Sequence, residues 1–300
     1  MSSLSRHGIG PAAALAALTA IWGYNWVVIK FALADSPPLT FSALRAVLSA
    51  LALFAVVLVL RRPLRPMRAK AVFALGALQT MGFVGFAALA VEFGTAGKSA
   101  VLAYTMPFWT LMLAGFFLGE RMRGAQWFAV VLAAGGLVGV LNPFDAGFGI
   151  ADSLFALGAA WCWAISNIVV KRLQLKGDEL FSVSAWQMLF GGLGLSVLAM
   201  AIDTEPVRWT VPFVVALGYN VVFATALAWL LWLFALNRLS AGATGLATLG
   251  APPVALAAAW LQLGEIPTRA EAVGMVLIIG ALACLTVSGW QTISRSTAAS

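Results

Sequence analysis

Charged residues are scarce in this 300-residue sequence: they make up 10% of the chain, against 62% hydrophobic residues. Eleven acidic and 18 basic residues cannot cover the surface of a water-soluble particle of this size. Apolar runs follow one another from Ile9 to Val287, so the lipid bilayer is the expected solvent. The basic residues lie in short gaps between these runs and form no basic stripe with exposed aromatic residues, so nucleic acid is not an expected partner.

Cysteine and histidine are nearly absent from the sequence. Cys162 and Cys284 both lie inside apolar runs, and the single histidine is His7 near the N-terminus. We therefore expect neither a disulfide framework nor a Cys/His metal site. An intramembrane enzyme would need a nucleophile with a base, or metal ligands at depth, and an ATP-driven motor would need a Gly-rich phosphate loop. The sequence has neither pattern, so we expect no enzyme and no cofactor.

Breaks at proline, glycine and charged clusters divide the apolar sequence into ten runs of about 20 residues, the length that a helix needs to cross the hydrocarbon layer. The sequence thus predicts an all-α polytopic membrane protein with ten transmembrane helices. The predicted spans are residues 11–33, 39–60, 71–92, 97–118, 124–141, 151–171, 181–202, 211–236, 241–263 and 269–289.

The basic residues are unevenly distributed between alternate loops. If the N-terminus lies in the cytoplasm, the basic loop at residues 61–70 and most of the other Lys and Arg residues also lie there. Because cytoplasmic loops carry an excess of Lys and Arg, we predict cytoplasmic N- and C-termini in a bacterial-type inner membrane.

The sequence repeats itself at a shift of 145 residues. This shift aligns Pro107 with Pro252, and it aligns the Leu-Gly-Glu sequence at residues 118–120 with the one at residues 263–265. A shift of 141 residues aligns the first run with the sixth.

Each half of this repeat contains five runs, and five is an odd number. The second half must therefore enter the membrane from the opposite side, which gives the inverted-topology repeat that is typical of secondary transporters. The predicted five-helix repeats are residues 1–141 and 142–300.

Several local motifs are typical of a known family: residues 21–26 and 96–100, Arg45, and the proline and Leu-Gly-Glu positions of both halves. In these residues the sequence resembles the drug/metabolite transporter superfamily in its ten-helix exporter branch, and within it the bacterial aromatic amino-acid exporters. Four-helix relatives carry a glutamate in the middle of their first helix for proton exchange, whereas this sequence has Asn25 and Lys30 there. Facilitated export is therefore expected, and the alternative is a proton-coupled exporter of drugs or other small metabolites.

Polar and aromatic side chains at mid-depth are candidates for the lining of a central cavity. Trp22 and Asn25 share one helix face, and the repeat places Trp163 and Asn167 on the corresponding face of the sixth run, so we expect these two faces to meet. Proline breaks free backbone carbonyls that a substrate ammonium can bind. For each candidate, helix packing or an interhelical hydrogen bond is the alternative. The predicted substrate-binding residues are Trp22, Asn25, Gln79, Thr80, Tyr104, Pro107, Trp163, Asn167, Tyr219 and Pro252.

Lys30, Arg45 and Lys98 lie near the predicted outer ends of their spans, where we expect them to snorkel or to pair with Asp35 or Glu92. The predicted cavity then has no fixed charge and suits a zwitterion with an apolar side chain. We expect phenylalanine, tyrosine, tryptophan, methionine, threonine or related metabolites as substrates. Membrane lipids are expected partners, and the sequence is compatible with a monomer or a homodimer.

Overall fold

The computed structural model describes residues 5–65, 68–119, 124–141, 150–173, 179–228, 231 and 250–298. Within these ranges the chain forms helices and no strand. The helices are α1 (Ser5–Leu33), α2 (Pro38–Val59), α3 (Ala69–Leu75), η1 (Gly76–Gly82), α4 (Phe83–Phe93), α5 (Ala96–Ala103), α6 (Met106–Leu118), α7 (Gly124–Leu141), α8 (Ala151–Leu173), α9 (Leu180–Ile202), α10 (Val211–Gly218), η2 (Tyr219–Leu227), α13 (Ala251–Leu263) and α14 (Arg269–Ala298).

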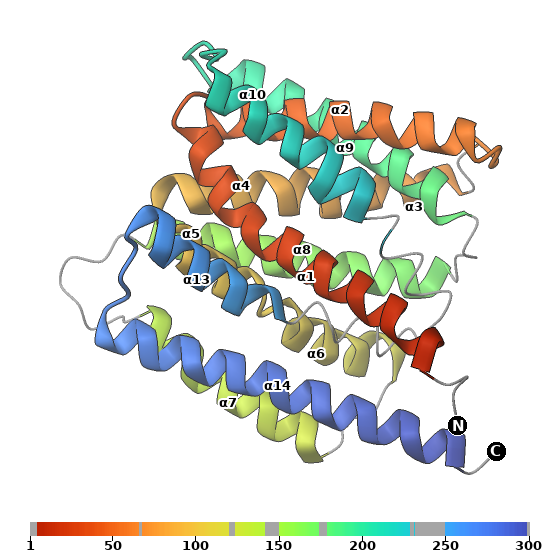
Figure 1. The fold of residues 1–300 in the computed structure, drawn as a ribbon, viewed down its shortest axis with the longest axis vertical. Helices are drawn as coiled ribbons and strands as arrows, with labels where there is room; N and C mark the ends of the chain where they lie inside the picture. Colours follow the sequence, from red (N-terminus) through yellow and green to blue (C-terminus); the bar gives the residue numbers. More distant parts are fainter. Residues whose placement is uncertain are drawn as a thin grey trace.

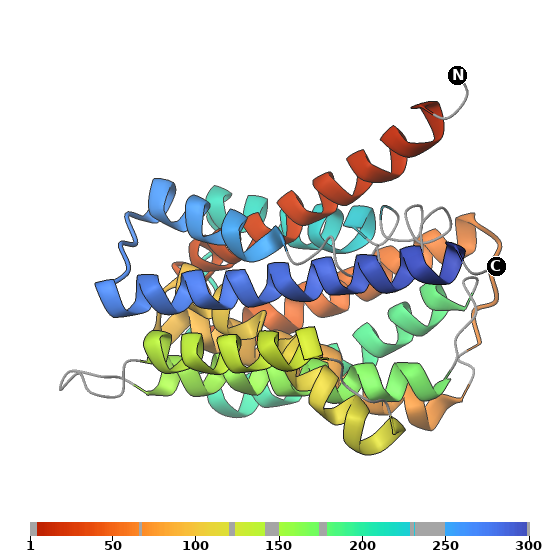
Figure 2. The same cartoon turned by 90° about the horizontal axis from the view of Figure 1, so that it is seen from below.

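The helices lie side by side in an elongated bundle. α2 packs along α9 at one extreme of the bundle, α7 packs along α14 at the other, and the remaining helices lie between these pairs (Figure 1). α1 begins and α14 ends at the same end of the bundle (Figure 2). The opposite end, where α5 and α14 begin, is the predicted outer end.

Seven helical stretches in the described part of the chain are long and apolar enough to cross a membrane, and they confirm the first seven predicted spans. The helices over Val211–Leu227 and Ala251–Leu263 are shorter. The rest of the eighth and ninth predicted spans falls mostly on residues 232–249, which lie outside the described residues. α14 covers the tenth predicted span.

Helix interruptions recur at the spacing of the sequence repeat. The π-helix η1 lies between α3 and α4, and the π-helix η2 follows α10 at matching positions 145 residues later. Pro107 stands in the first turn of α6 and Pro252 in the first turn of α13. Because π-helices shift the backbone hydrogen-bond register and proline removes a donor, the two halves depart from a regular α-helix at equivalent places.

The α7–α14 pair at one extreme of the bundle depends on small residues. A Cβ atom on Gly274 of α14 would lie 2.5 Å from the carbonyl oxygen of Gly136 in α7, closer than real Cβ contacts allow. Glycine therefore permits the close backbone approach of these two helices, as small residues do at helix interfaces in membranes.

A methyl group added at this interface should destabilise the protein. Gly136→Ala places a Cβ atom 2.7 Å from the carbonyl oxygen of Gly274, whereas Gly135→Ala meets no atom within 4 Å. Overpacking costs about 1–3 kcal/mol, so we expect a lower unfolding temperature in detergent for Gly136→Ala. Gly135→Ala should leave that temperature unchanged or raise it, since alanine is the better helix former. Equal effects of the two substitutions would contradict this account of the interface.

Candidate functional site

The aromatic face of α1 contacts the π-helix η2. The Trp22 indole Nε1 donates a hydrogen bond to the carbonyl oxygen of Ala224 at 3.0 Å. The Tyr219 hydroxyl donates to the carbonyl oxygen of Ile21 at 2.8 Å, and its ring meets the Tyr24 ring edge-on, with centroids 5.8 Å apart. Trp22 and Tyr219, both predicted site residues, are therefore brought together.

The corresponding face of α8 contacts the π-helix η1 and α6. The Trp163 ring packs on the ring of Phe83, the first residue after η1, with centroids 4.7 Å apart. The Asn167 side-chain amide donates to the Thr110 hydroxyl at 3.2 Å. We expected the Trp22 and Trp163 faces to meet each other, whereas each packs against the interrupted helix of the opposite half. The reason is that η2 presents the Ala224 carbonyl and the Tyr219 ring to the Trp22 face, while Phe83, which follows η1, meets Trp163. The sequence predicted neither π-helix.

The break between α5 and α6 lies at Tyr104 and Thr105. The Thr105 hydroxyl donates to the carbonyl oxygen of Leu102 at 2.6 Å and accepts from the Trp109 indole at 3.0 Å. Tyr104 is buried at this break, 6% exposed. The carbonyls of residues 248 and 249, which we expected Pro252 and the following proline to free, lie outside the described residues.

Gln79 and Thr80 lie in η1, and only Gln79 remains half-buried. Thr80 is buried against α9, since a Cβ atom on Gly191 would lie 2.4 Å from the Thr80 Cβ. Its repeat counterpart Thr225 is also buried against a neighbouring helix, because the Ser49 hydroxyl of α2 donates a hydrogen bond to the Thr225 hydroxyl at 3.2 Å. Both threonines join interrupted helices to their neighbours, which was the alternative reading for Thr80.

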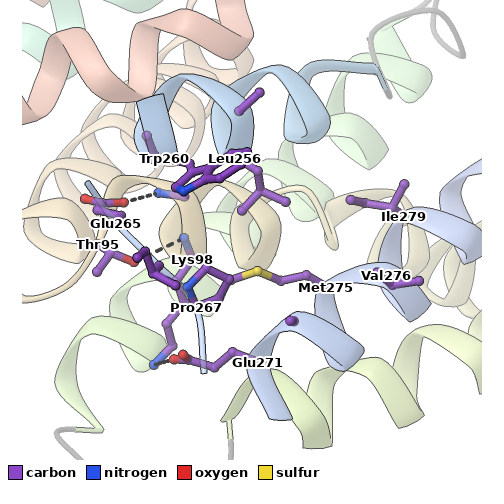
Figure 3. A pocket seen from close by; sticks show the side chains of 15 residues that line it. Thr95, Lys98, Leu256, Trp260, Glu265, Pro267, Glu271, Met275, Val276 and Ile279 are labelled. Carbon is purple, nitrogen blue, oxygen red and sulfur yellow. Dashed lines mark hydrogen bonds and ion pairs between the residues drawn. The ribbon is translucent and has the colours of Figure 1, made fainter. Parts of the chain in front are cut away.

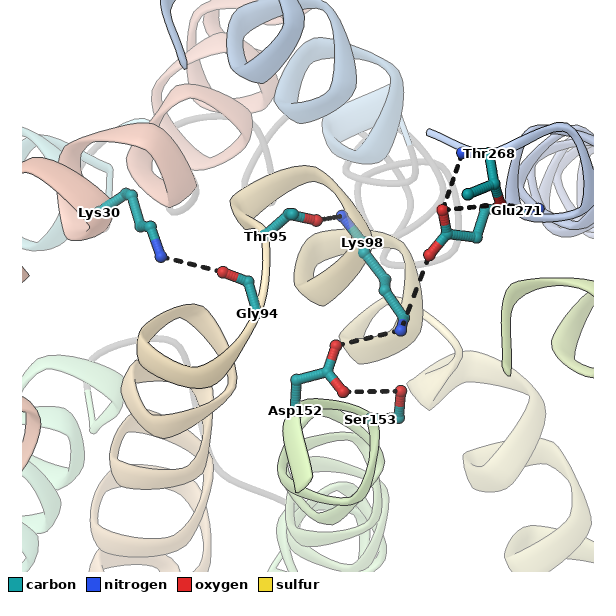
Figure 4. Close-up of polar contacts among 8 residues, drawn as sticks. All are labelled: Lys30, Gly94, Thr95, Lys98, Asp152, Ser153, Thr268 and Glu271. Carbon is teal, nitrogen blue, oxygen red and sulfur yellow. Dashed lines mark hydrogen bonds and ion pairs between the residues drawn. The ribbon is translucent and has the colours of Figure 1, made fainter. Parts of the chain in front are cut away.

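Two lysines near the predicted outer end are held by partners other than the expected Asp35 and Glu92 (Figure 4). The Lys98 ammonium lies 3.1 Å from the Asp152 carboxylate and 3.8 Å from that of Glu271. Lys98 and Asp152 are almost fully buried, with side chains 9% exposed. Asp152 and Glu271 come from the first turns of α8 and α14, so only the tertiary arrangement brings them to Lys98.

Lys30 is satisfied by backbone at the end of α4. Its ammonium donates to the carbonyl oxygens of Val91 at 2.7 Å and Gly94 at 2.9 Å. Asp35 instead pairs with Arg208 at 3.1 Å. We expected these lysines to snorkel or to pair with Asp35 or Glu92, and neither pair forms among the described residues. Carbonyls at the C-terminus of α4 hold Lys30, because free carbonyls at a helix C-terminus attract a cation.

The Leu-Gly-Glu sequence at residues 263–265 has a structural role that the sequence did not reveal. Gly264 ends α13 with a φ of 66°, a left-handed conformation that favours glycine. The chain then turns back, and the Glu265 carboxylate accepts hydrogen bonds from the amides of Ala96 at 2.9 Å and Gly97 at 3.0 Å. Glu265 thus caps α5 of the other half. The equivalent Glu120 lies outside the described residues.

A pocket of about 540 Å³ lies between α5, α13 and α14 (Figure 3). Its walls are mainly apolar, and Lys98, Glu265 and Glu271 contribute the charged groups. None of the ten predicted substrate-binding residues lines it. In the described residues, no group of three or more His, Cys, Asp and Glu side chains could hold a metal ion.

Four buried polar atoms have no hydrogen-bond partner among the described residues: Asn25 Oδ1, Arg45 Nη1, Ser99 Oγ and Asn220 Oδ1. Asn25 is a predicted site residue, whereas the sequence did not single out Arg45, Ser99 or Asn220 as binding residues. Arg45 lies over the Phe41 ring, 5.9 Å from its centroid, and no described carboxylate forms an ion pair with it. Of its two expected alternatives, snorkelling and pairing with Asp35 or Glu92, the pairing is therefore not formed. The available signal was a cation well inside an apolar run, which usually marks function.

Comparison with known proteins identifies the class. The chain belongs to the EamA-like transporter family, whose model matches residues 10–142 and 152–287. It is 31% identical over 273 residues to an uncharacterized transporter of Bacillus subtilis (strain 168), covering 87% of this chain and 91% of the relative. It is 30% identical over 273 residues to a probable amino-acid metabolite efflux pump of Escherichia coli (strain K12), covering 87% and 90%.

The fold has a relative among solved structures. A crystal structure of a protein that is 20% identical superposes with a TM-score of 0.65, covering 93% of this chain and 97% of that chain. The resemblance to the drug/metabolite transporter superfamily is thus confirmed, and the chain is a multi-pass membrane protein of a transporter family.

The buried ion pair of Lys98 should contribute to stability. Lys98→Met leaves two carboxylates without their cation, and breaking a buried pair costs about 3–5 kcal/mol. We expect a clearly lower unfolding temperature in detergent, partly restored by adding Asp152→Asn. Arg208→Met is the control: its side chain is 69% exposed, and exposed pairs contribute about 0–1 kcal/mol. If Lys98→Met and Arg208→Met had the same small effect, Lys98 would not hold the outer end together.

Proposed function

We propose that this protein is a facilitative exporter of neutral amino acids with apolar or aromatic side chains in a bacterial inner membrane. Phenylalanine, tyrosine, tryptophan, methionine, threonine and related metabolites are the proposed substrates. The observation that carries the proposal is that Trp22 and Trp163, aligned by the repeat, each contact the π-helical region of the other half. Membership of a transporter family and similarity to a probable amino-acid metabolite efflux pump point to the same class of substrate.

The proposed architecture is a pair of inverted five-helix repeats, residues 1–141 and 142–300, with both termini in the cytoplasm. The matched π-helices and proline positions support it, as does the match of one family model to two successive segments. The helix packing is also reciprocal: α1 packs on α13 and η2, while α8 packs on α6 and η1. Such halves have near-equivalent packings toward the two sides of the membrane, which is the basis of alternating access.

Substrate recognition would use the groups that the interruptions expose. Tyr104 and Gln79 lie at two interruptions, and the carbonyl of Ala103 loses its helical donor to Pro107. Such a carbonyl would accept one N–H of a substrate ammonium, which has two further donors, and the rings of Trp22 and Trp163 would contact an apolar side chain.

The outer end would be held closed by charge. Lys98 bridges Asp152 of α8 and Glu271 of α14, whereas the 145-residue shift places Ala243 and Gln126 at the positions equivalent to Lys98 and Glu271. An inverted repeat exchanges the outer and inner ends of the two halves. The equivalent positions at the predicted inner end therefore carry uncharged residues, which cannot form this ionic bridge. This asymmetry would favour the state that opens to the cytoplasm, from which an exporter loads its substrate.

Uptake into proteoliposomes tests the proposal. We expect saturable movement of labelled phenylalanine, tryptophan and methionine without a proton gradient, and several-fold slower movement for Gln79→Ala and Trp163→Ala. Trp127→Ala is the matched control, because Trp127 is 54% exposed near a predicted span end and should not affect transport.

The same assay shows whether transport is coupled to a proton gradient. Lys98, Asp152 and Glu271 form a titratable cluster, which is the observation that favours a proton-coupled exporter as the second candidate. Movement only under an imposed proton gradient would establish that candidate, and the absence of movement for every amino acid would reject the proposed substrates.

A further inference from the structure

Two contacts fix how α2 lies along the α10–η2 helix. Near the predicted outer end, the Phe41 and Phe213 rings meet edge-on with centroids 6.3 Å apart. Deeper in the bundle, the Ser49 hydroxyl donates to the Thr225 hydroxyl at 3.2 Å. Between these two contacts, the residues that share a helix face with the contact residues therefore lie at the same short stretch of the interface.

Arg45 and Asn220 lie on this stretch. Arg45 is four residues after Phe41 and four before Ser49, so it shares their helix face. Asn220 is five residues before Thr225, one π-helical turn, and its carbonyl oxygen accepts a hydrogen bond from the Thr225 hydroxyl at 2.9 Å. Both residues thus lie about one turn outward of the Ser49–Thr225 contact.

Both side chains have a buried atom without a hydrogen-bond partner among the described residues. These atoms are Arg45 Nη1, a donor, and Asn220 Oδ1, an acceptor. The Asn220 side-chain nitrogen already donates to the carbonyl oxygen of Ala216 at 3.1 Å, and Asn220 is only 1% exposed. A buried polar group without a partner is costly, and more so when it is charged. The interface therefore holds one unmet donor and one unmet acceptor.

Arg45 differs from the lysines near the same end of the membrane. The ammonium groups of Lys30 and Lys98 have acceptors, the former at the end of α4 and the latter on Asp152 and Glu271. Arg45 has none in the described part of the chain, although it lies seven residues inside α2, about 10 Å along the helix axis. An intramembrane cation in this position calls for an anionic partner, which the described residues do not supply there.

We propose that Arg45 binds the α-carboxylate of the exported amino acid and that Asn220 Oδ1 accepts a hydrogen bond from its α-ammonium. This inference rests on the proposed function and names the residues that bind the α-carboxylate and the α-ammonium of the substrate. A guanidinium offers two parallel donors to a carboxylate, and an α-amino acid carries its donor and acceptor on one carbon. Both unmet atoms are covered in this state, so η2 must move away from α2 to admit the substrate.

The sequence repeat supports a single site of this kind in each chain. The 142-residue shift that aligns residues 42–43 with residues 184–185 places Gln187 opposite Arg45. Gln187 is buried, 3% exposed, and neutral. The second half therefore lacks the guanidinium, and one carboxylate is recognised per transport cycle.

Binding of three small ligands to the purified full-length protein tests the inference. Phenylalanine carries both charged groups, 2-phenylethylamine lacks the carboxylate, and 3-phenylpropionate lacks the ammonium. We expect Arg45→Gln to weaken phenylalanine and 3-phenylpropionate at least tenfold and to leave 2-phenylethylamine within twofold. Arg45→Lys should weaken phenylalanine less than Arg45→Gln does. Asn220→Ala should weaken phenylalanine and 2-phenylethylamine but not 3-phenylpropionate.

The ligand panel separates a binding role from a structural one. Loss of all three ligands together in Arg45→Gln and Arg45→Lys would show that Arg45 only maintains the fold, and unchanged phenylalanine binding in Arg45→Gln would equally overturn the inference. Arg208→Gln is the control for general loss of positive charge and should bind as the unmodified protein does. In either of these outcomes the proposed function stands, whereas an unmodified protein that binds no amino acid would reject both.

Discussion

The hydrocarbon layer requires every backbone amide and carbonyl within it to find a partner inside the protein. Long stretches such as α2 and α9 meet this requirement with continuous helical hydrogen bonds. The interruptions at η1, η2 and the α5–α6 break need additional donors, which side chains supply: Trp22 donates to Ala224 and Thr105 donates to Leu102. Three of the candidate residues, Gln79, Tyr104 and Tyr219, lie at these interruptions. The cost of breaking a helix and these candidate binding groups therefore arise at the same places.

At the predicted outer end, charged side chains satisfy the free backbone groups of helix termini. The N-termini of α5, α8 and α14 all lie there, and each carries an acidic partner: Glu265 caps α5, while Asp152 and Glu271 stand in the first turns of α8 and α14. Lys98 then neutralises two of these carboxylates from a buried position. These ion pairs and hydrogen bonds connect helices that are distant in the sequence. When one half moves against the other, they must either break or act as the axis of rotation.

The sequence predicted features that depend on local patterns. Hydrophobic runs placed the spans, and Pro107 with Pro252 marked breaks at equivalent positions, since proline acts on its own helix. The partners of Lys98, the capping by Glu265 and the lack of a described ion-pair partner for Arg45 depend on helices that are far apart in the sequence, and a single sequence does not specify that arrangement. The π-helices were also missed, because they have no strong signature in residue type. Consequently the sequence named candidate residues one by one, and the structure shows which of them lie around opposite interrupted helices.

The central claim is that one position at mid-depth becomes accessible from each side of the membrane in turn. The chain has only two cysteines, Cys162 and Cys284, so replacing both and introducing Gln79→Cys gives a single reactive thiol. Labelling this thiol in oriented proteoliposomes with a membrane-impermeant reagent, added to one side or the other, measures its accessibility with and without phenylalanine. The account predicts labelling from both sides, with phenylalanine changing the ratio of the two rates. Labelling from one side only under every condition, or from neither side, would contradict alternating access at this position.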